Sequence, residues 1–282
     1  MRCKECYSIF QNITGQEFEQ LHHEAFQTHT FVNSVIARSG LEPTRERWAE
    51  LSLPGTSVLE IGPGSGHLLA AAREAGRTVT AIETSEVNRN FIRETWGIDS
   101  VYSDLADVPG DLSFDAVVAI NVVEHIYDIA SFLGSISKML SKNGTIFIST
   151  VNGISLEAAV LRNWWAMCKE HDHVSFPSPK GLSRVASAAD LRPERIWSGE
   201  LPFEFLISAL VAARDWGQAK RHPDAGLSHD HATEDLPAAA DLSRTTRLAR
   251  FYSFSTHLDP TSRLLSALGR AATVKARLRR AG

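Results

Sequence analysis

A glycine-rich stretch at residues 58–69, VLEIGPGSGHLL, constrains the fold of this chain more than any other feature. A short, mostly apolar run leads into three glycines at alternate positions, Gly62, Gly64 and Gly66, and a helical run begins at once. A buried strand, a tight glycine turn and a helix N-terminus form the layout of a nucleotide-binding βα unit. Glycines let a ligand approach the backbone closely, and the free N–H groups of the helix start attract a negative group.

The spacing of the glycines separates two classes of nucleotide-binding turn. A dinucleotide fingerprint, G-x-G-x-x-G, needs its third glycine at position 67, which is histidine. The chain instead reads E-x-G-x-G-x-G, with Glu60 ahead of the glycines. This pattern resembles motif I of the class I S-adenosylmethionine-dependent methyltransferases. The resemblance implies that the turn lies under the methionine part of the cofactor, with Glu60 near its amino group. A tight βα turn without a ligand is the alternative.

Strands alternate with helices from Val58 to Thr150. Each apolar run of strand length is followed by residues with helical spacing, which predicts right-handed βαβ crossovers. We therefore expect an α/β fold with a Rossmann-like, doubly wound and mostly parallel sheet. One or two N-terminal helices over residues 16–38 and a C-terminal helical extension complete the predicted architecture.

Acidic and polar residues follow the carboxyl ends of the predicted strands, where such sheets bind ligands. Glu83 ends the second strand, and a carboxylate there can accept hydrogen bonds from both ribose hydroxyls. The methyltransferase resemblance implies that Asp104 accepts a hydrogen bond from the adenine amino group, with Asp107 as the alternate. It also implies that Leu105, beside Asp104, flanks the adenine ring. We expect Asn121, after the fourth strand, to hold the donor's amino group through its backbone carbonyl.

Three histidines are candidate catalytic bases. His125 lies within EHI at residues 124–126, which matches the E-H-hydrophobic signature of many small-molecule methyltransferases. The resemblance implies that this position faces the donor methyl, and its ordinary pKa suits a general base. A structural histidine that orients the loop is the alternative. His171 and His173, on either side of Asp172, are the second candidates. Their alternatives are a metal site shared with an acid and a solvated loop, and we predict no metal ligands.

The N-terminus carries one C-x-x-C, formed by Cys3 and Cys6. A structural zinc site needs four ligands. Methyltransferases that resemble this chain often have an N-terminal zinc ribbon with C-x-x-C twice, so this chain has only half of such a ribbon. A zinc site completed by Cys168, His22 or His23 is one hypothesis. A vestigial, redox-inert pair of cysteines is the other.

We divide the chain into an N-terminal segment with cap helices (1–52), an S-adenosylmethionine-binding domain (53–200) and a C-terminal helical extension (201–282). From Arg244 onward there are nine lysines or arginines and one acid. The spacing of Leu264, Leu268 and Leu278 predicts a basic amphipathic helix. We expect it to dock on its own domain or on a partner subunit, with contact to an anionic membrane surface as the lesser alternative. Deleting the residues after Arg244 is then expected to spare donor binding.

Composition limits the partners and the compartment. The 282-residue chain has a formal net charge of −4, which gives no general attraction to nucleic acid. Three cysteines are an odd number for a disulfide framework. No apolar run has the length of a membrane span, and the N-terminus has no apolar signal core. We therefore expect a cytoplasmic protein, whose oligomeric state the sequence leaves open.

These patterns together predict an S-adenosylmethionine-dependent methyltransferase that acts on a small-molecule acceptor. We expect the acceptor atom to be a hydroxyl oxygen of a sugar, of a phenol or quinone, or of a natural product. An NAD-dependent oxidoreductase is one alternative, and the histidine at position 67 argues against it. A non-catalytic Rossmann-like binding module is the other.

Overall fold

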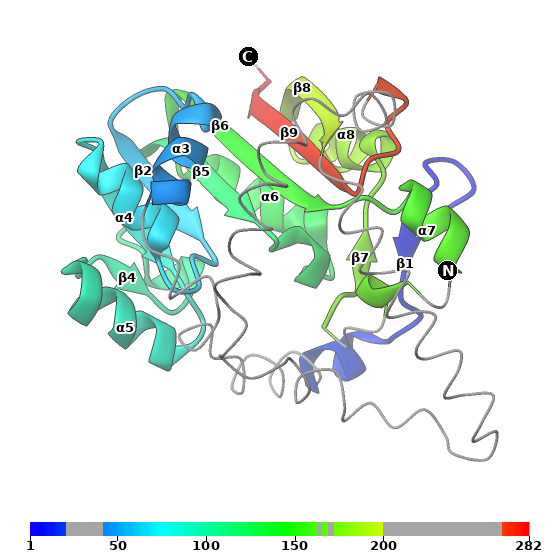
Figure 1. The fold of residues 1–282 in the computed structure, drawn as a ribbon, viewed down its shortest axis with the longest axis horizontal. Helices are drawn as coiled ribbons and strands as arrows, with labels where there is room; N and C mark the ends of the chain where they lie inside the picture. The colour runs from blue at the N-terminus through cyan, green and yellow to red at the C-terminus, as the bar shows by residue number, and fades with distance from the viewer. Residues whose placement is uncertain (21–41, 163–164, 169–171, 200–266, 282) are drawn as a thin grey trace.

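A seven-stranded sheet with the order β4-β3-β2-β5-β6-β9-β8 forms the centre of the molecule (Figure 1). The structure is a computed structural model that describes residues 1–20, 42–162, 165–168, 172–199 and 267–281. The strands of this sheet are β2 (Ser57–Ile61), β3 (Thr78–Ile82), β4 (Val101–Tyr102), β5 (Phe114–Ile120), β6 (Leu140–Val151), β8 (Leu191–Gly199) and β9 (Thr273–Arg280). Neighbours pair in parallel, except that β9 is antiparallel to β6 and β8. The predicted Rossmann-like, mostly parallel sheet is confirmed.

Helices cover both faces of the sheet and make three layers (Figure 1). One face packs against α3 (Glu42–Leu51), α4 (His67–Glu74) and α5 (Glu86–Trp96), and the other against α6 (Ile129–Lys138) and α8 (Pro179–Ala188). The strands alternate between the two buried cores. In β2, for example, Val58 packs with α3 and α4, whereas Leu59 and Ile61 pack with α6 and α8. Burial on both faces explains why the central strands read as nearly continuous apolar runs.

The strand order reverses at β2, which pairs with β3 on one side and with β5 on the other. Open α/β sheets bind ligands at the carboxyl ends of their strands beside such a reversal. The glycine turn follows β2, and residues 121–126 follow β5. The topology therefore brings both predicted parts of the site to one edge of the sheet.

The C-terminal residues correct the predicted basic helix. Residues 273–280 form β9, which lies between β6 and β8. Val274, Ala276 and Leu278 are fully buried on one face, and the residues between them are basic. This alternation has the period of two that a strand requires. Strand β9 pairs with β6 and β8, which both lie within residues 53–200. The domain boundary predicted at residue 200 therefore falls between strands of one sheet. The predicted residues Leu264 and 201–266 lie outside the described part of the chain.

Helices α6 and α7 are both short. Helix α6 ends at Lys138, and Gly144 lies inside β6. Residues 154–169 do not form one helix in the part that the structure describes, because α7 (Leu156–Leu161) stops at Arg162, whose backbone has φ 49° and ψ −118°. No helix in the described part of the chain is long and apolar enough to cross a membrane.

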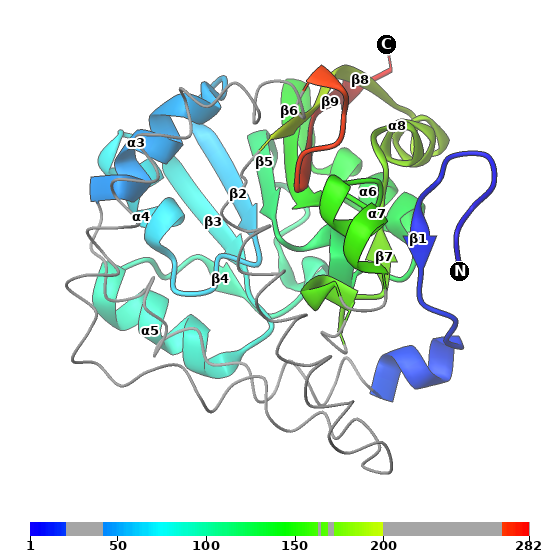
Figure 2. The same ribbon diagram turned by 45° about the vertical axis from the view of Figure 1, so that its right-hand side comes forward.

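The N-terminus forms a small hairpin at the side of the molecule (Figure 2). Strand β1 (Ile9–Phe10) pairs antiparallel with β7 (Ser175–Phe176), a short strand after β6. The chain is helical at residues 15–20, the start of the expected N-terminal helices. The remainder of that expectation, with His22 and His23, falls outside the described residues.

Candidate active site

The glycine turn has a backbone that other residues adopt only at a cost. Gly62, Gly64 and Gly66 have φ values of 64°, 55° and 74°, all in the left-handed region. A methyl group on Gly62 would also lie 2.8 Å from Cγ2 of Val122, which belongs to the segment that follows β5. The conformation and this close approach explain why glycine recurs at alternate positions. The turn lies at the carboxyl end of β2, where the three glycine N–H groups donate to the carbonyls of Ile82 and Pro63 and to the carboxylate of Glu83.

The histidine that breaks the dinucleotide fingerprint has a structural role. His67 is the first residue of α4 and is buried. Its Nδ1 lies 2.9 Å from Oγ of Ser65, and its ring meets the edge of Trp96 at a centroid distance of 5.1 Å. The Nε1–H of Trp96 donates to the carbonyl of Ser65 at 2.8 Å. These contacts fix the end of the turn against α5.

Glu83 braces the glycine turn from the end of β3. Its Oε2 accepts a hydrogen bond from the N–H of Gly64 at 3.0 Å, and its Oε1 accepts one from the N–H of Ser85 at 2.9 Å. Burial raises the pKa of Glu83, although these two hydrogen bonds act in the opposite direction. Carboxylate oxygens have further lone pairs, so the group can hold the turn and still accept from a ligand.

Glu60 is a buried carboxyl inside β2, only 6% exposed. Burial raises its pKa to about 8. The positive charge of Arg47 lowers this pKa, and the negative charge of Glu83 raises it by a smaller amount. Its carboxyl makes no hydrogen bond to the described residues. A buried acid without a strong partner becomes ionised when a cation is placed beside it. The position therefore suits a ligand that carries an ammonium group.

The remaining predicted cofactor residues lie at neighbouring strand ends. Asp104 and Leu105 follow β4, where Asp104 is exposed and accepts a hydrogen bond from the N–H of Ala106 at 2.8 Å. Asp107 accepts from the N–H of Asp104 at 3.1 Å, so the two acids hold one short turn. Asn121 follows β5 with φ 54°, and its N–H donates to Ser149 at 2.8 Å. All of these positions share the carboxyl edge of the sheet.

His125 and Asp172 form a pair at this edge. His125 ends the 3₁₀ turn η3 (Val123–His125), and its Nδ1 lies 3.1 Å from Oδ2 of Asp172 and 3.2 Å from the Asp172 carbonyl. Burial opposes the charged imidazole, but the hydrogen bond and the charges of Glu124 and Asp172 outweigh it and raise the pKa of His125. Burial also opposes ionisation of Asp172, yet its contact with His125 holds its pKa at about 2. An ionised Asp172 keeps the proton of neutral His125 on Nδ1 and the lone pair on Nε2.

Glu124 and His173 complete a buried polar cluster around this pair. Oε2 of Glu124 accepts a hydrogen bond from the hydroxyl of Thr150 at 2.7 Å, and burial raises its pKa. The ring of His173 meets that of His125 at a centroid distance of 4.7 Å, and its Nδ1 lies 3.1 Å from the carbonyl of Met167. Ligand atoms of Glu124, His125 and His173 lie within 4.8 Å of one another, a spacing that can also hold a metal ion.

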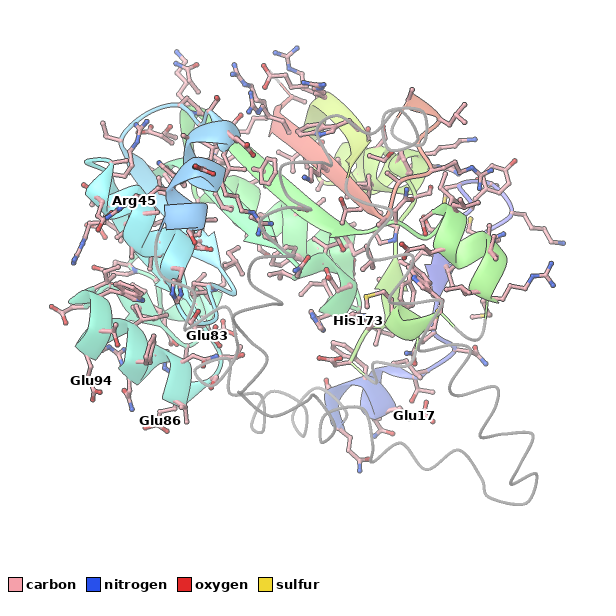
Figure 3. The ribbon with its side chains drawn as sticks, in the orientation of Figure 1. Glu17, Arg45, Glu83, Glu86, Glu94 and His173 are labelled. Carbon is pink, nitrogen blue, oxygen red and sulfur yellow. The ribbon has the colours of Figure 1, made fainter. Side chains whose placement is uncertain are left out.

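The loop after β6 brings these residues together by folding back over η3. The N–H of Val174 donates to the carbonyl of Glu124 at 2.8 Å, and the hydroxyl of Ser175 donates to the carbonyl of Ile126 at 3.0 Å. In Figure 3, Glu83 and His173 both lie toward the lower edge of the sheet. His171, the remaining candidate base, lies outside the described residues. Sequence reasoning passed over Asp172, although its place between two histidines drew attention to the segment.

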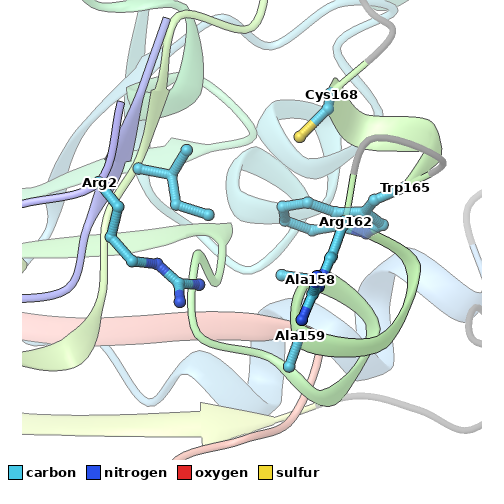
Figure 4. Close-up of a pocket in the computed structure, with 7 residues that line it drawn as sticks. Arg2, Ala158, Ala159, Arg162, Trp165 and Cys168 are labelled. Atoms are coloured by element: carbon cyan, nitrogen blue, oxygen red, sulfur yellow. The ribbon is translucent and has the colours of Figure 1, made fainter.

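A cavity of about 390 Å³ lies away from this edge, between α7 and the N-terminal hairpin (Figure 4). Arg2, Ile9, Arg162, Trp165 and Cys168 are among the residues that line it. Among the residues that the structure describes, no predicted cofactor or catalytic residue lines it. Cys3 and Cys6 are not part of this cavity, and the metal-like cluster in the described residues does not include them.

Comparison with known proteins gives consistent matches. The model of a methyltransferase domain family matches residues 27–196, more than half of the chain. The chain is 31% identical to the ubiquinone biosynthesis O-methyltransferase of Methylocella silvestris over 52% of its own length and 62% of the relative's, less than two thirds of that protein. It is 30% identical to the ubiquinone biosynthesis O-methyltransferase of Thiobacillus denitrificans, over 55% of its own length and 74% of the relative's.

Solved structures share the fold at low sequence identity. Geranyl diphosphate C-methyltransferase from Streptomyces coelicolor, solved with S-adenosylhomocysteine, superposes with a TM-score of 0.51 at 16% identity, over 84% of this chain and 78% of that one. A geranyl diphosphate methyltransferase solved with S-adenosylmethionine gives a TM-score of 0.51 at 15% identity, over 96% and 92% of the two chains.

Proposed function

Because the chain belongs to the class I S-adenosylmethionine-dependent methyltransferases, we propose that it transfers a methyl group to a hydroxyl oxygen of a small molecule. One observation carries the choice of oxygen: the pair of His125 and Asp172 at the carboxyl edge of the sheet. A hydroxyl acceptor must lose a proton during the reaction, so an enzyme for it benefits from a positioned base. The names of the curated relatives support the same acceptor atom.

The residues at the strand ends suit the parts of the methyl donor. Bound S-adenosylmethionine supplies a methyl group already activated by its sulfonium. In our proposal the backbone of the glycine turn, Gly62 to Gly66, lies against the methionine part, and Glu60 and the Asn121 carbonyl hold its ammonium group. Glu83 binds the ribose hydroxyls, and Asp104 with Leu105 holds the adenine. The fit is supported by Glu60, whose buried carboxyl has a raised pKa and would be ionised by an ammonium group placed beside it.

The chain's own part in the reaction is to position the acceptor and take its proton. Asp172 keeps a proton on Nδ1 of His125, so Nε2 accepts the proton of the acceptor hydroxyl. The charge of Asp172 then stabilises the imidazolium. The buried surroundings of Glu124 and His173 limit water around the pair. Since the donor is activated, holding the acceptor in line supplies much of the remaining rate.

A phenolic hydroxyl is the acceptor that this base fits best. A phenol has a pKa near 10, so an imidazole with a raised pKa lies only a few units below it. An aliphatic alcohol is a far weaker acid and gains less from such a base. The relatives act in ubiquinone biosynthesis by name, which supports a phenol or quinol class over a sugar for this chain.

Methyl transfer from labelled donor to a panel of phenols, sugars, alcohols and amines tests the proposal. We expect phenols to be methylated. His125→Ala should lower kcat by about 10²- to 10⁴-fold while donor affinity, measured by calorimetry, stays the same. Methylation of amines alone, or an unchanged kcat in the variant, would contradict the proposed base. Donor binding without transfer to any acceptor would favour the non-catalytic module instead.

A further inference from the structure

The N-terminal hairpin holds Cys3 and Cys6 in a closed turn. The N–H of Tyr7 donates to the carbonyl of Cys3 at 3.0 Å, and the N–H of Cys3 donates to the carbonyl of Ser8 at 2.9 Å. Tyr7 has a φ of 64°, so the chain reverses directly after Cys6. The hydrogen bond from Tyr7 to Cys3 closes a single turn that carries both cysteines, and both line the same small hollow beside Arg184. Two thiols at this spacing are close enough for a disulfide after a side-chain rotation.

The two thiols differ in a way that suits thiol–disulfide exchange. Cys3 is partly exposed, whereas Cys6 is buried. Hydrogen bonds from the backbone N–H groups of Cys6 and Glu5 lower the pKa of Cys3. Arg184 lies beside the turn and pairs with Glu5 at 2.6 Å. A partly exposed thiol with a lowered pKa next to a buried second thiol is the arrangement of a reactive cysteine and its resolving partner.

We propose that Cys3 and Cys6 form a reversible dithiol–disulfide pair that low-molecular-weight disulfides oxidise. The Cys3 thiolate attacks one sulfur of the small disulfide, forms a mixed disulfide and releases one thiolate. The Cys6 thiol then attacks the Cys3 sulfur, closes the internal disulfide and expels the second thiolate. The two cysteines lose two electrons and two protons in total, and the small disulfide becomes two thiols.

A metal site is the competing use of the same sulfur atoms. Tetrahedral zinc needs four ligands, and the hairpin offers two. The three-residue cluster found in the described part of the chain lies at Glu124, His125 and His173 and includes neither cysteine. The exchange reaction needs nothing beyond the pair itself and a common class of oxidant. The proposal therefore rests on the pair of cysteines itself, and a bound metal is an outcome that the experiment below distinguishes.

Oxidation at this place acts on a segment that leads to the candidate active site. Ser178 donates through its hydroxyl to the Cys6 carbonyl and through its N–H to Oγ of Ser8 at 3.0 Å. The thiol of Cys6 donates to the same Oγ at 3.4 Å. Further along, the side-chain amide of Gln11 donates to the carbonyl of His173 at 2.7 Å. A disulfide removes the thiol donor and stiffens the hairpin that holds this segment.

To test the pair, the whole chain is equilibrated in glutathione buffers with an increasing proportion of glutathione disulfide. Intact mass and the number of free thiols are then measured. We expect the free thiols to fall from three to one, with loss of two hydrogens and recovery by reductant. Cys6→Ser should stop at a mixed disulfide on Cys3, and Cys3→Ser should stay unmodified. Cys168→Ser is the matched control and should still form the disulfide, because Cys168 is not part of the pair. Burial raises the pKa of Cys168, which makes this thiol less reactive.

Three results would overturn the proposal. The first is three free thiols at every buffer composition in the wild-type protein, which needs no variant to fold. The second is glutathione attached to Cys168 in preference to Cys3. The third is a stoichiometric bound metal whose chelation is needed before the thiols react. None of these readouts uses methyl transfer, so failure of the proposed function would leave this result intact.

Discussion

Glu60 connects the ionisation of one residue with donor binding. Burial raises its pKa to about 8, so the free protein holds this carboxyl protonated at neutral pH. An ammonium group beside it favours the carboxylate and lowers its pKa. We therefore expect donor binding at pH 7 to release a proton, and the calorimetric binding enthalpy to vary with the ionisation enthalpy of the buffer.

Two variants check the origin of that proton. Glu60→Gln keeps the size of the side chain and should abolish the proton release. Glu86→Gln changes an exposed carboxyl at the start of α5 and should retain it. Proton exchange that is absent in the wild-type protein would place the ammonium group elsewhere.

Asp172 should set the pH dependence of turnover through His125. A base must be neutral to accept a proton, so kcat should rise as pH increases through the raised pKa of His125. Asp172→Asn removes the partner that raises this pKa. We expect the inflection of kcat to move to lower pH and the plateau to fall, because Nδ1 loses its negatively charged partner. A pH–rate profile with an NMR titration of His125 measures both, and an unmoved inflection would exclude the coupling.

The same pair should contribute to stability over a defined pH range. The contribution of Asp172, whose pKa is lowered to about 2, is present above its unfolded value of about 4 and is lost as pH falls. The contribution of His125 is complete below about 6.5 and is lost as pH rises through its raised pKa. The difference in Tm between wild type and Asp172→Asn should thus be largest between about pH 4 and pH 6.5. A difference independent of pH would show that packing, not charge, stabilises the pair.

Residues in short motifs could be predicted from the sequence, whereas their distant partners could not. The local signature at residues 124–126 singled out His125. Asp172 lies 47 residues away and reaches His125 only because the N–H of Val174 binds the Glu124 carbonyl. That contact depends on how a loop after β6 returns over η3, which no spacing in the sequence encodes. The roles of the individual site residues remain predictions.

At the scale of elements, local periodicity predicted β2 to β6 and failed at β9. Residues 114–120 (FDAVVAI) and the second half of β6 (TIFISTV) are mostly apolar, so the sequence indicated strands there. In β9 the basic residues fall at alternate positions, but arginines at 263, 270 and 277 also repeat at sevens. The repeat at sevens led to a helix prediction, which was wrong. The strand partners of β9 lie far away in the sequence, so local spacing did not reveal them. The sheet supplies them, with Ile146 opposite Leu278.

The interior position of β9 makes it necessary for the fold. Leu278 is fully buried between β6 and β8, and Leu278→Ala should reduce the free energy of unfolding by about 2–5 kcal/mol in denaturant titrations. Arg279→Ala is the control, since its pair with Glu194 is partly exposed and worth about 1 kcal/mol or less. Equal effects of the two changes would mean that β9 pairs weakly. Deletion after Arg244, expected from the sequence to spare donor binding, should instead destabilise the sheet because it removes β9.

For the whole molecule, ligand-linked stability separates the candidate functions. A ligand that binds only the folded state at a concentration of 100 Kd stabilises it by about 2.7 kcal/mol. S-adenosylhomocysteine should therefore raise Tm, and NAD should leave it unchanged because His67 and its contacts replace the third glycine of a dinucleotide turn. A rise in Tm with NAD and none with S-adenosylhomocysteine would favour an oxidoreductase.

The places of β1 and β9 in the fold decide where a purification tag can be joined. Polypeptide fused ahead of residue 1 emerges beside the hairpin that pairs with β7, so its bulk would press on the segment leading to Asp172. Because β9 runs against the parallel strands, the chain leaves it at their amino ends. A tag fused after residue 282 would therefore hang from the end of the sheet farthest from the reacting groups, and it is the safer choice for assays.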